Sequence, residues 1–228
     1  MPDHYDTLLH EITERLPDAK VIAIECTNAL QPSMAWIAYY LHADQHNPAN
    51  KICESAYSAG VEAVTLISLS MLRSAVYSLR SHYEFYLMYL YYKDHPIELE
   101  ACLEFRNDFL LPGKIKEYFK LNFENYGKRI ESTNKNKSRD QDDYYKVLSS
   151  VAHGSAINSQ PTALEPKEIL FEKASLETAV NIFKYTSENL SDYSIAIFPS
   201  NWASLPEITR QNLTLRMGVK SRSELKFA

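Results

Sequence analysis

Arg80 and Glu84 are the first candidates for chemistry, because they stand one helical turn apart in the most strongly helical stretch of the sequence, residues 72–94. Side chains four residues apart share one face of a helix, so the guanidinium and the carboxylate can pair. Their neighbours are tyrosines and leucines, and a charge among such residues is costly to bury unless it has a partner or a ligand. Two interpretations stay open: an intrahelical surface pair contributing a few tenths of a kcal/mol, or part of a site.

His153 is the second candidate, in the last turn of a helix expected over residues 142–153. The carbonyl dipoles at a helix C-terminus favour the charged imidazolium. Ser149 lies one turn earlier and is placed to hydrogen-bond the ring. The alternative is a capping histidine that contacts only backbone, and the helix taken alone favours that alternative.

Other chemistry has weaker support in the sequence. There is no GxSxG nucleophile elbow and no HExxH pair, and only five glycines argue against a phosphate-binding loop. His42 and His46 share a helical spacing, but Asn47 and Pro48 follow at once, so we expect no metal site and no cofactor. The basic loop 135–139 is expected to be solvated.

Composition limits the class of protein and its partners. A net charge of −5 disfavours nonspecific coating of nucleic acid. The acidic N-terminus has no apolar signal segment, and no run is long and apolar enough to span a membrane. We therefore expect a cytoplasmic protein that does not enter the membrane. The cysteines form no CxxC pair and are expected to be buried and reduced: Cys26, Cys53 and Cys102.

The spacing of apolar residues predicts an all-α fold, a single-domain helical bundle around the long central helix 72–94. Helices are expected over residues 5–16, 19–42, 51–94, 98–107, 115–130, 142–153 and 175–198. Pro17 should end the first helix and Pro32 should kink or break the second. The pattern over 51–94 is long for one helix, so either it breaks near Gly60 or Ser68–Ser70, or it forms one spine. Residues 1–205 are expected to form the bundle domain and 206–228 a basic helical tail.

Two segments together resemble a known family. RSAVYSLRSHYEFYLMYLYYKD, with Arg80 and Glu84, is followed by YYKVLSSVAHGS, with the pattern Tyr-x-x-Leu-Ser-x-x-Ala-His-Gly from Tyr145 to Gly154. Together they resemble a family of uncharacterised bacterial proteins (the DUF5677-like group), which is similar to a distant branch of the HEPN superfamily of helical bundles. The resemblance covers roughly a third of the chain.

The resemblance implies a metal-independent endoribonuclease of a bacterial defence or toxin–antitoxin system, acting on RNA as a homodimer and with a cognate protein partner. In that reading His153 is the general acid–base, Arg80 the phosphate clamp and Glu84 the residue that orients it. The family motif is an Arg, four to six residues and a His. This sequence departs from the motif, because the base before His153 is Lys146, which cannot grip phosphate bidentately.

Two further interpretations stay open. A non-catalytic interaction or antitoxin-like module of the same fold would hold these residues in a buried polar network, and it accounts simply for the missing arginine. A small-molecule or nucleotide sensor would instead use a tyrosine-lined cleft. The distance between His153 and Arg80 separates a composite site from these alternatives.

Overall fold

The computed structural model describes residues 2–135, 143–153, 163–217 and 219–225. It confirms the all-α prediction, and no strand occurs in these ranges. The α-helices, in chain order, are α1 (Pro2–Ala43), α2 (Asn50–Ser68), α3 (Leu72–Tyr92), α4 (Pro96–Leu103), α5 (Pro112–Asn122), α6 (Tyr126–Asn134), α7 (Tyr145–Ala152), α8 (Lys173–Ile197), α9 (Glu207–Arg216) and α10 (Val219–Glu224). Two 3-10 helices flank α8, η2 (Pro166–Ile169) and η3 (Pro199–Ser204).

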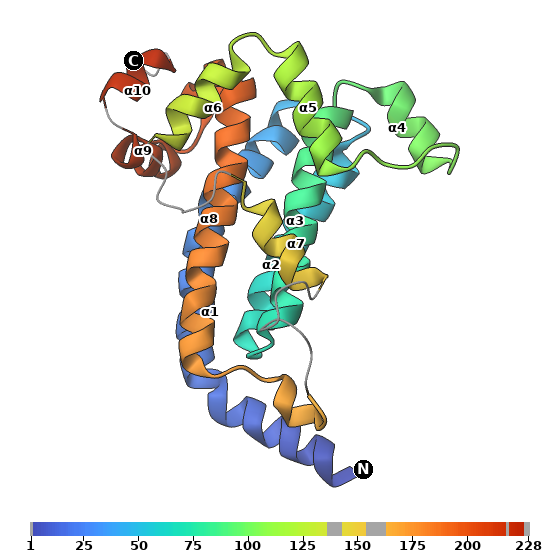
Figure 1. Ribbon diagram of the computed structural model, residues 1–228, viewed down its shortest axis with the longest axis vertical. Helices are drawn as coiled ribbons and strands as arrows, with labels where there is room; N and C mark the ends of the chain where they lie inside the picture. The colour runs from blue at the N-terminus through green and yellow to red at the C-terminus, as the bar shows by residue number, and fades with distance from the viewer. Residues whose placement is uncertain (1, 136–142, 154–162, 218, 226–228) are drawn as a thin grey trace.

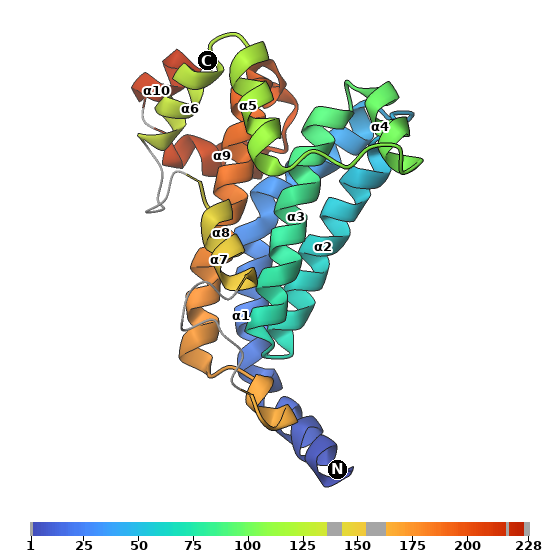
Figure 2. The same ribbon diagram turned by 45° about the vertical axis from the view of Figure 1, so that its right-hand side comes forward.

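Helix α3 is the centre of the bundle, as the sequence predicts. It packs against α2 and α8, and α7 and α5 cover its remaining faces (Figures 1 and 2). Leu79, Tyr83 and Leu87, at successive helical turns, are fully buried in the core. Burial of large side chains around most of the helix supplies the apolar area that stabilises such a bundle.

Helix α1 is continuous through both of its prolines, so the prediction that Pro17 ends a helix is wrong, and of the kink or break predicted at Pro32 the break does not occur. Pro17 and Thr13 are both exposed, so water can satisfy the Thr13 carbonyl that loses its helical donor. Near Pro32 a neighbouring helix bonds to backbone groups on both sides of the proline. The Ser33 N–H donates to Ser187 Oγ of α8 at 3.0 Å, and that hydroxyl lies 3.2 Å from the Leu30 carbonyl.

The first turns of α1 extend beyond the bundle, below the other helices in Figures 1 and 2. No residue from 4 to 18 is buried, and burial begins at Ala19. Arg15 ties this extension to the chain before α8 by donating to the Phe171 carbonyl at 3.0 Å. The extension thus has few tertiary contacts of its own.

The break between α2 and α3 falls at Leu69–Met71, next to the serine-rich segment named in one of the two predictions. Ser70 turns the chain with a φ of 61°, and its carbonyl accepts a 2.9 Å bond from the Phe171 N–H. Gly60 lies inside α2 without interrupting it. A Cβ there would displace the flexible end of Met34 and crowd the ring of His82, so glycine favours close packing of α2 on α1 and α3.

The expected helix 115–130 is two helices, α5 and α6, and this prediction is wrong. Asn125 separates them with a φ of 58°, a left-handed conformation that asparagine tolerates better than most residues. Helix α4 is shorter than predicted and projects from the bundle (Figure 1). Residues 131–134, between two of the predicted helices, belong to α6, and 136–142, with most of the basic loop 135–139, lie outside the described residues.

The C-terminal helices pack on α8 through a buried ion cluster. Arg216 of α9 donates to Glu188 at 2.9 Å and also to Asp192, both on α8. Burial alone would lower the pKa of Arg216, but the two carboxylates outweigh it and raise that pKa. Leu213 and Met217 of the same segment are buried beside this cluster. The division into a bundle domain at 1–205 and a tail at 206–228 stays a prediction.

Two composition-based expectations can be compared with the fold. Cys26, Cys53 and Cys102 are all buried free thiols, as predicted. Burial raises the pKa of Cys26 and of Cys53 to about 12. Within the described ranges, no helix combines the length and apolar character needed to cross a membrane.

Candidate functional site

Helix α7 is held on α3 along its whole length. Its buried side chains, Leu148 and Ala152, point into the core one turn apart. At the C-terminal end, the Tyr77 hydroxyl of α3 donates to the Ala152 carbonyl at 2.6 Å. This bond satisfies a carbonyl that a helix end otherwise leaves without a partner, and it fixes the residue next to His153.

The N-terminal end of α7 is fixed by Asp143. Its Oδ1 accepts a 3.2 Å bond from the Tyr145 N–H, an Asx arrangement that starts the helix. The same oxygen lies 3.0 Å from the hydroxyl of Tyr83 on α3, and the other carboxylate oxygen pairs with Lys116 of α5. Asp143 therefore joins three helices at the point where α7 begins.

Arg80 is the centre of the site, because each of its three guanidinium nitrogens has a different partner. Nε donates to Glu84 Oε1 at 2.9 Å, Nη2 donates to the Tyr145 hydroxyl at 3.2 Å, and Nη1 lies 3.2 Å from His153 Nε2. The Tyr145 hydroxyl in turn donates to Glu84 Oε1 at 2.8 Å. We call Arg80, Glu84, Tyr145 and His153 the Arg80 cluster.

The contact with Arg80 defines the state of the His153 ring. A guanidinium has donors only and stays protonated in proteins, so His153 Nε2 must accept this hydrogen bond. The imidazole is then neutral and carries its proton on Nδ1. Nε2 is consequently the atom that can take up a proton once Arg80 moves to another acceptor.

Aromatic rings support the cluster from one side. Tyr145 stacks on Tyr83, with ring centroids 5.4 Å apart and planes 29° from parallel. The Arg80 guanidinium carbon and Lys116 Nζ lie 5.5 Å and 5.6 Å from the centroid of the Tyr145 ring, within the range of cation–π attraction. Two cations thus lie near one aromatic ring on the surface of the bundle.

The electrostatics keep the guanidinium charged and the phenol protonated. Burial alone would lower the pKa of Arg80, but the Glu84 carboxylate and Tyr145 outweigh it, so that pKa is raised. Burial raises the pKa of Tyr145, and the Glu84 carboxylate raises it further against the opposing charge of Arg80. Tyr145 therefore serves as a hydrogen-bond donor and not as a base.

Solvent reaches the cluster. The side chains of Arg80 and Glu84 keep 21% and 30% of their exposure, and His153 is exposed. A substrate can therefore approach these groups without an opening of the bundle. The same exposure places the Arg80–Glu84 pair among half-solvated ion pairs, which contribute on the order of 0.5 kcal/mol to stability.

The structure brings together three of the four residues singled out from the sequence. Arg80, Glu84 and His153 meet, whereas Lys146 is exposed and makes no hydrogen bond or ion pair within the described part of the chain. The bond expected from the Ser149 side chain to the His153 ring does not form, and only the Ser149 carbonyl accepts from the His153 N–H, at 2.9 Å.

Sequence reasoning missed several members of the site. Tyr145 belongs to the segment that carries the family resemblance, but its hydroxyl was given no role. Lys116 had no signal in the sequence, because only tertiary packing brings α5 to the start of α7. For Tyr77 the sequence offers one indication, because Tyr77 shares a helical face with Arg73 and Arg80.

The four described ranges contain no group of three or more His, Cys, Asp or Glu side chains that could hold a metal ion. Comparisons of the chain with protein-family models, with curated proteins and with solved structures gave no match. The case for a function therefore rests on the site geometry and on the resemblance of the two segments.

Proposed function

We propose that this chain is a HEPN-like endoribonuclease of a bacterial defence or toxin–antitoxin system, with the Arg80 cluster as its catalytic site. The observation that carries the proposal is the 3.2 Å approach of Arg80 Nη1 to His153 Nε2 on a solvent-reached surface. The two residues are 73 positions apart and belong to different helices, so their meeting is not a consequence of local sequence.

The chemistry that fits these groups is cleavage of RNA by its own ribose. His153 Nε2 removes the proton of the 2′-hydroxyl, the 2′-oxygen attacks the adjacent phosphorus, and the bond from phosphorus to the 5′-oxygen breaks. The protonated His153 then gives its proton to the leaving 5′-oxygen, directly or through a water molecule, which yields a 2′,3′-cyclic phosphate and a 5′-hydroxyl and restores the neutral ring. Arg80 stabilises the negative charge that builds up on the phosphoryl oxygens.

Binding of a phosphate group would break the contact between Arg80 and His153. A phosphoryl oxygen competes for Arg80 Nη1, and when Arg80 turns to it, His153 Nε2 loses its donor and becomes free to act as a base. Glu84 and Tyr145 still hold Nε and Nη2 during this change. Glu84 and Tyr145 are then positioning residues, and Arg80 supplies the bidentate guanidinium that Lys146 cannot provide.

Homodimerisation, RNA as the substrate and a cognate protein partner remain parts of this proposal. Because Arg80 and His153 come from the same chain, assembly of the pair itself does not depend on a second copy. Dimerisation would therefore alter the access of RNA to the site or the binding of RNA around it.

A non-catalytic module of the same fold is the second candidate, and one observation favours it. All three guanidinium nitrogens of Arg80 already have partners within the protein, which is typical of a structural network. In that case the cluster would fasten α7 to α3, and replacing Arg80 would loosen α7 without any effect on RNA.

An RNA-cleavage assay separates the two candidates. Single-stranded RNA is incubated with the wild type, His153→Ala, Arg80→Ala and the matched control His46→Ala, an exposed histidine remote in sequence from both segments. We expect cleavage by the wild type and the control in the presence of a metal chelator, and a loss of at least about 100-fold in both cluster variants. Equal cleavage by the wild type and His153→Ala would eliminate the proposed chemistry.

A further inference from the structure

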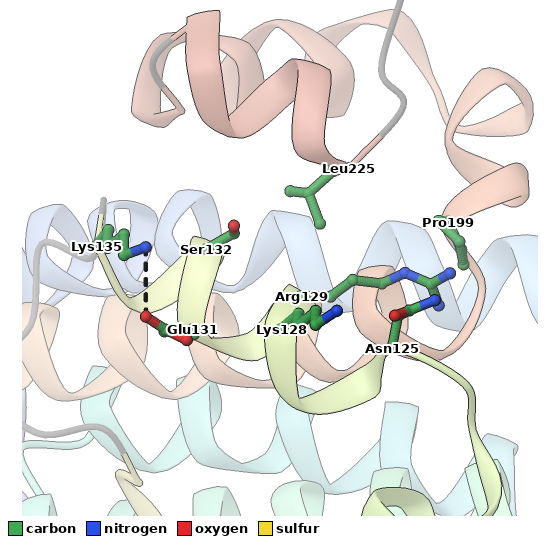
Figure 3. Close-up of a pocket in the computed structure, with 8 residues that line it drawn as sticks. All are labelled: Asn125, Lys128, Arg129, Glu131, Ser132, Lys135, Pro199 and Leu225. Atoms are coloured by element: carbon green, nitrogen blue, oxygen red, sulfur yellow. Dashed lines mark ion pairs between the residues drawn. The ribbon is translucent and has the colours of Figure 1, made fainter.

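A cavity with basic side chains on its wall lies away from the Arg80 cluster, between α6, the chain that follows α8, and the end of α10. Its volume is about 430 Å³, within the usual range for small-ligand sites. Figure 3 shows Lys128 and Arg129 of α6, and Lys135 just after it, on one side of the cavity, with Leu225 across from them and Pro199 beside the end of the Arg129 side chain. The cavity therefore combines a basic wall with an apolar wall.

The basic wall carries an excess of positive charge. Lys128, Arg129 and Lys135 face the cavity against one carboxylate, that of Glu131. Glu131 pairs with Lys135 at 3.3 Å, but both side chains are more than half exposed, so this pair is weak. Lys128 is exposed and makes no ion pair within the described ranges. Like charges gathered on one wall repel one another, and an anion in the cavity would relieve that repulsion.

Arg129 is fixed in place by the fold. One of its terminal nitrogens donates to the Ala196 carbonyl near the end of α8 at 2.9 Å, which holds a half-buried guanidinium at the edge of the cavity. A guanidinium has five N–H donors, so this single bond leaves others for a ligand. The preformed position of Arg129 lowers the entropy cost of binding an anion.

We propose that this cavity binds a phosphate monoester. The three cations offer charge-assisted hydrogen bonds that match a dianionic phosphate, and Leu225 and Pro199 can pack against the organic group that bears it. The monoester has two sources with the same chemistry, a free mononucleotide and the 5′ end of an RNA. The site uses none of the residues of the Arg80 cluster, so it goes beyond the proposed function and does not depend on it.

Isothermal titration of the full chain with adenosine monophosphate and with adenosine tests the proposal. The variants are Lys128→Gln and Lys135→Gln, both at exposed positions where the fold does not depend on the charge. The matched control is Lys114→Gln, an exposed α5 lysine that pairs with Glu117. We expect the monophosphate to bind, adenosine not to bind, each variant to weaken binding about tenfold, and the control to match the wild type.

A second titration distinguishes the sources, using a short RNA with a 5′-phosphate and the same RNA with a 5′-hydroxyl. Tighter binding of the 5′-phosphorylated RNA than of the mononucleotide assigns the site to RNA ends, and equal binding assigns it to the phosphate alone. The proposal is overturned if adenosine binds as well as its monophosphate, if neither the monophosphate nor the 5′-phosphorylated RNA binds, or if Lys128→Gln binds like the wild type. A failure here would leave RNA cleavage by the Arg80 cluster untouched.

Discussion

Acid should weaken the fold through one buried imidazole, that of His82. This side chain is fully buried in α3, with Nδ1 2.7 Å from the Ala56 carbonyl and Nε2 3.1 Å from Ser33 Oγ. A carbonyl only accepts, so Nδ1 carries the proton and Nε2 accepts from the Ser33 hydroxyl. In this neutral tautomer both ring nitrogens have a hydrogen-bond partner. A second proton would bind at Nε2, which could then no longer accept from the Ser33 hydroxyl.

The magnitude follows from the pKa of His82, which burial lowers from 6.5 to about 4. Between these values the unfolded chain binds a proton that the folded chain does not, so the free energy of unfolding falls as the pH falls. The loss in the free energy of unfolding caused by His82 is absent above pH 6.5, reaches about 2 kcal/mol near pH 5, and levels off at about 3 kcal/mol below pH 4.

Urea unfolding followed by circular dichroism measures this effect at about pH 7 and about pH 5. The variant His82→Gln lacks the titrating group, so the stability difference between it and the wild type should shrink by about 2 kcal/mol on acidification. His42→Gln, at an exposed position, is the matched control and should keep the wild-type dependence on pH. The reasoning is refuted if His82→Gln loses as much stability as the wild type over this range.

Three further outcomes follow from the structure. Replacing Arg216 by Leu removes the cation that pairs with two buried carboxylates and should cost about 3–5 kcal/mol in urea unfolding, and a loss below about 1 kcal/mol would contradict a buried ion cluster. Tyr145→Phe should cost only about 1 kcal/mol of stability while it lowers RNA cleavage more than about tenfold, and an unchanged rate would remove Tyr145 from the site. Cys26 and Cys53, whose pKa values are about 12, should resist an aromatic disulfide reagent until the chain is unfolded, and rapid labelling of both in the native protein would contradict their burial.

The sequence pattern predicted the features that depend on residues close together in one helix. The i, i+3, i+4 spacing of leucines and tyrosines placed α3 at the centre of the bundle, and the four-residue spacing of Arg80 and Glu84 predicted their ion pair. The sequence could name His153 as a partner only through the resemblance, because the distance between two helices 60 residues apart depends on the packing of the whole bundle.

The errors have tertiary causes. Helix α1 continues through Pro32, where Ser187, from a distant part of the chain, bonds to the Ser33 N–H and the Leu30 carbonyl on either side of the proline. The separation of α5 from α6 depends on one asparagine in a left-handed conformation, which propensity alone does not distinguish from a helical residue. Lys146 occupies the expected place in the motif but is exposed on α7, and the cation that lies beside His153 is Arg80 of another helix.

The end groups of RNA fragments produced by the wild-type protein test the central claim most directly. If His153 activates the ribose hydroxyl beside Arg80, the fragments carry 2′,3′-cyclic phosphate and 5′-hydroxyl ends, and an RNA with one 2′-deoxyribose is left intact at that position. Fragments with 3′-hydroxyl and 5′-phosphate ends, or cleavage at the 2′-deoxy position, would contradict the account.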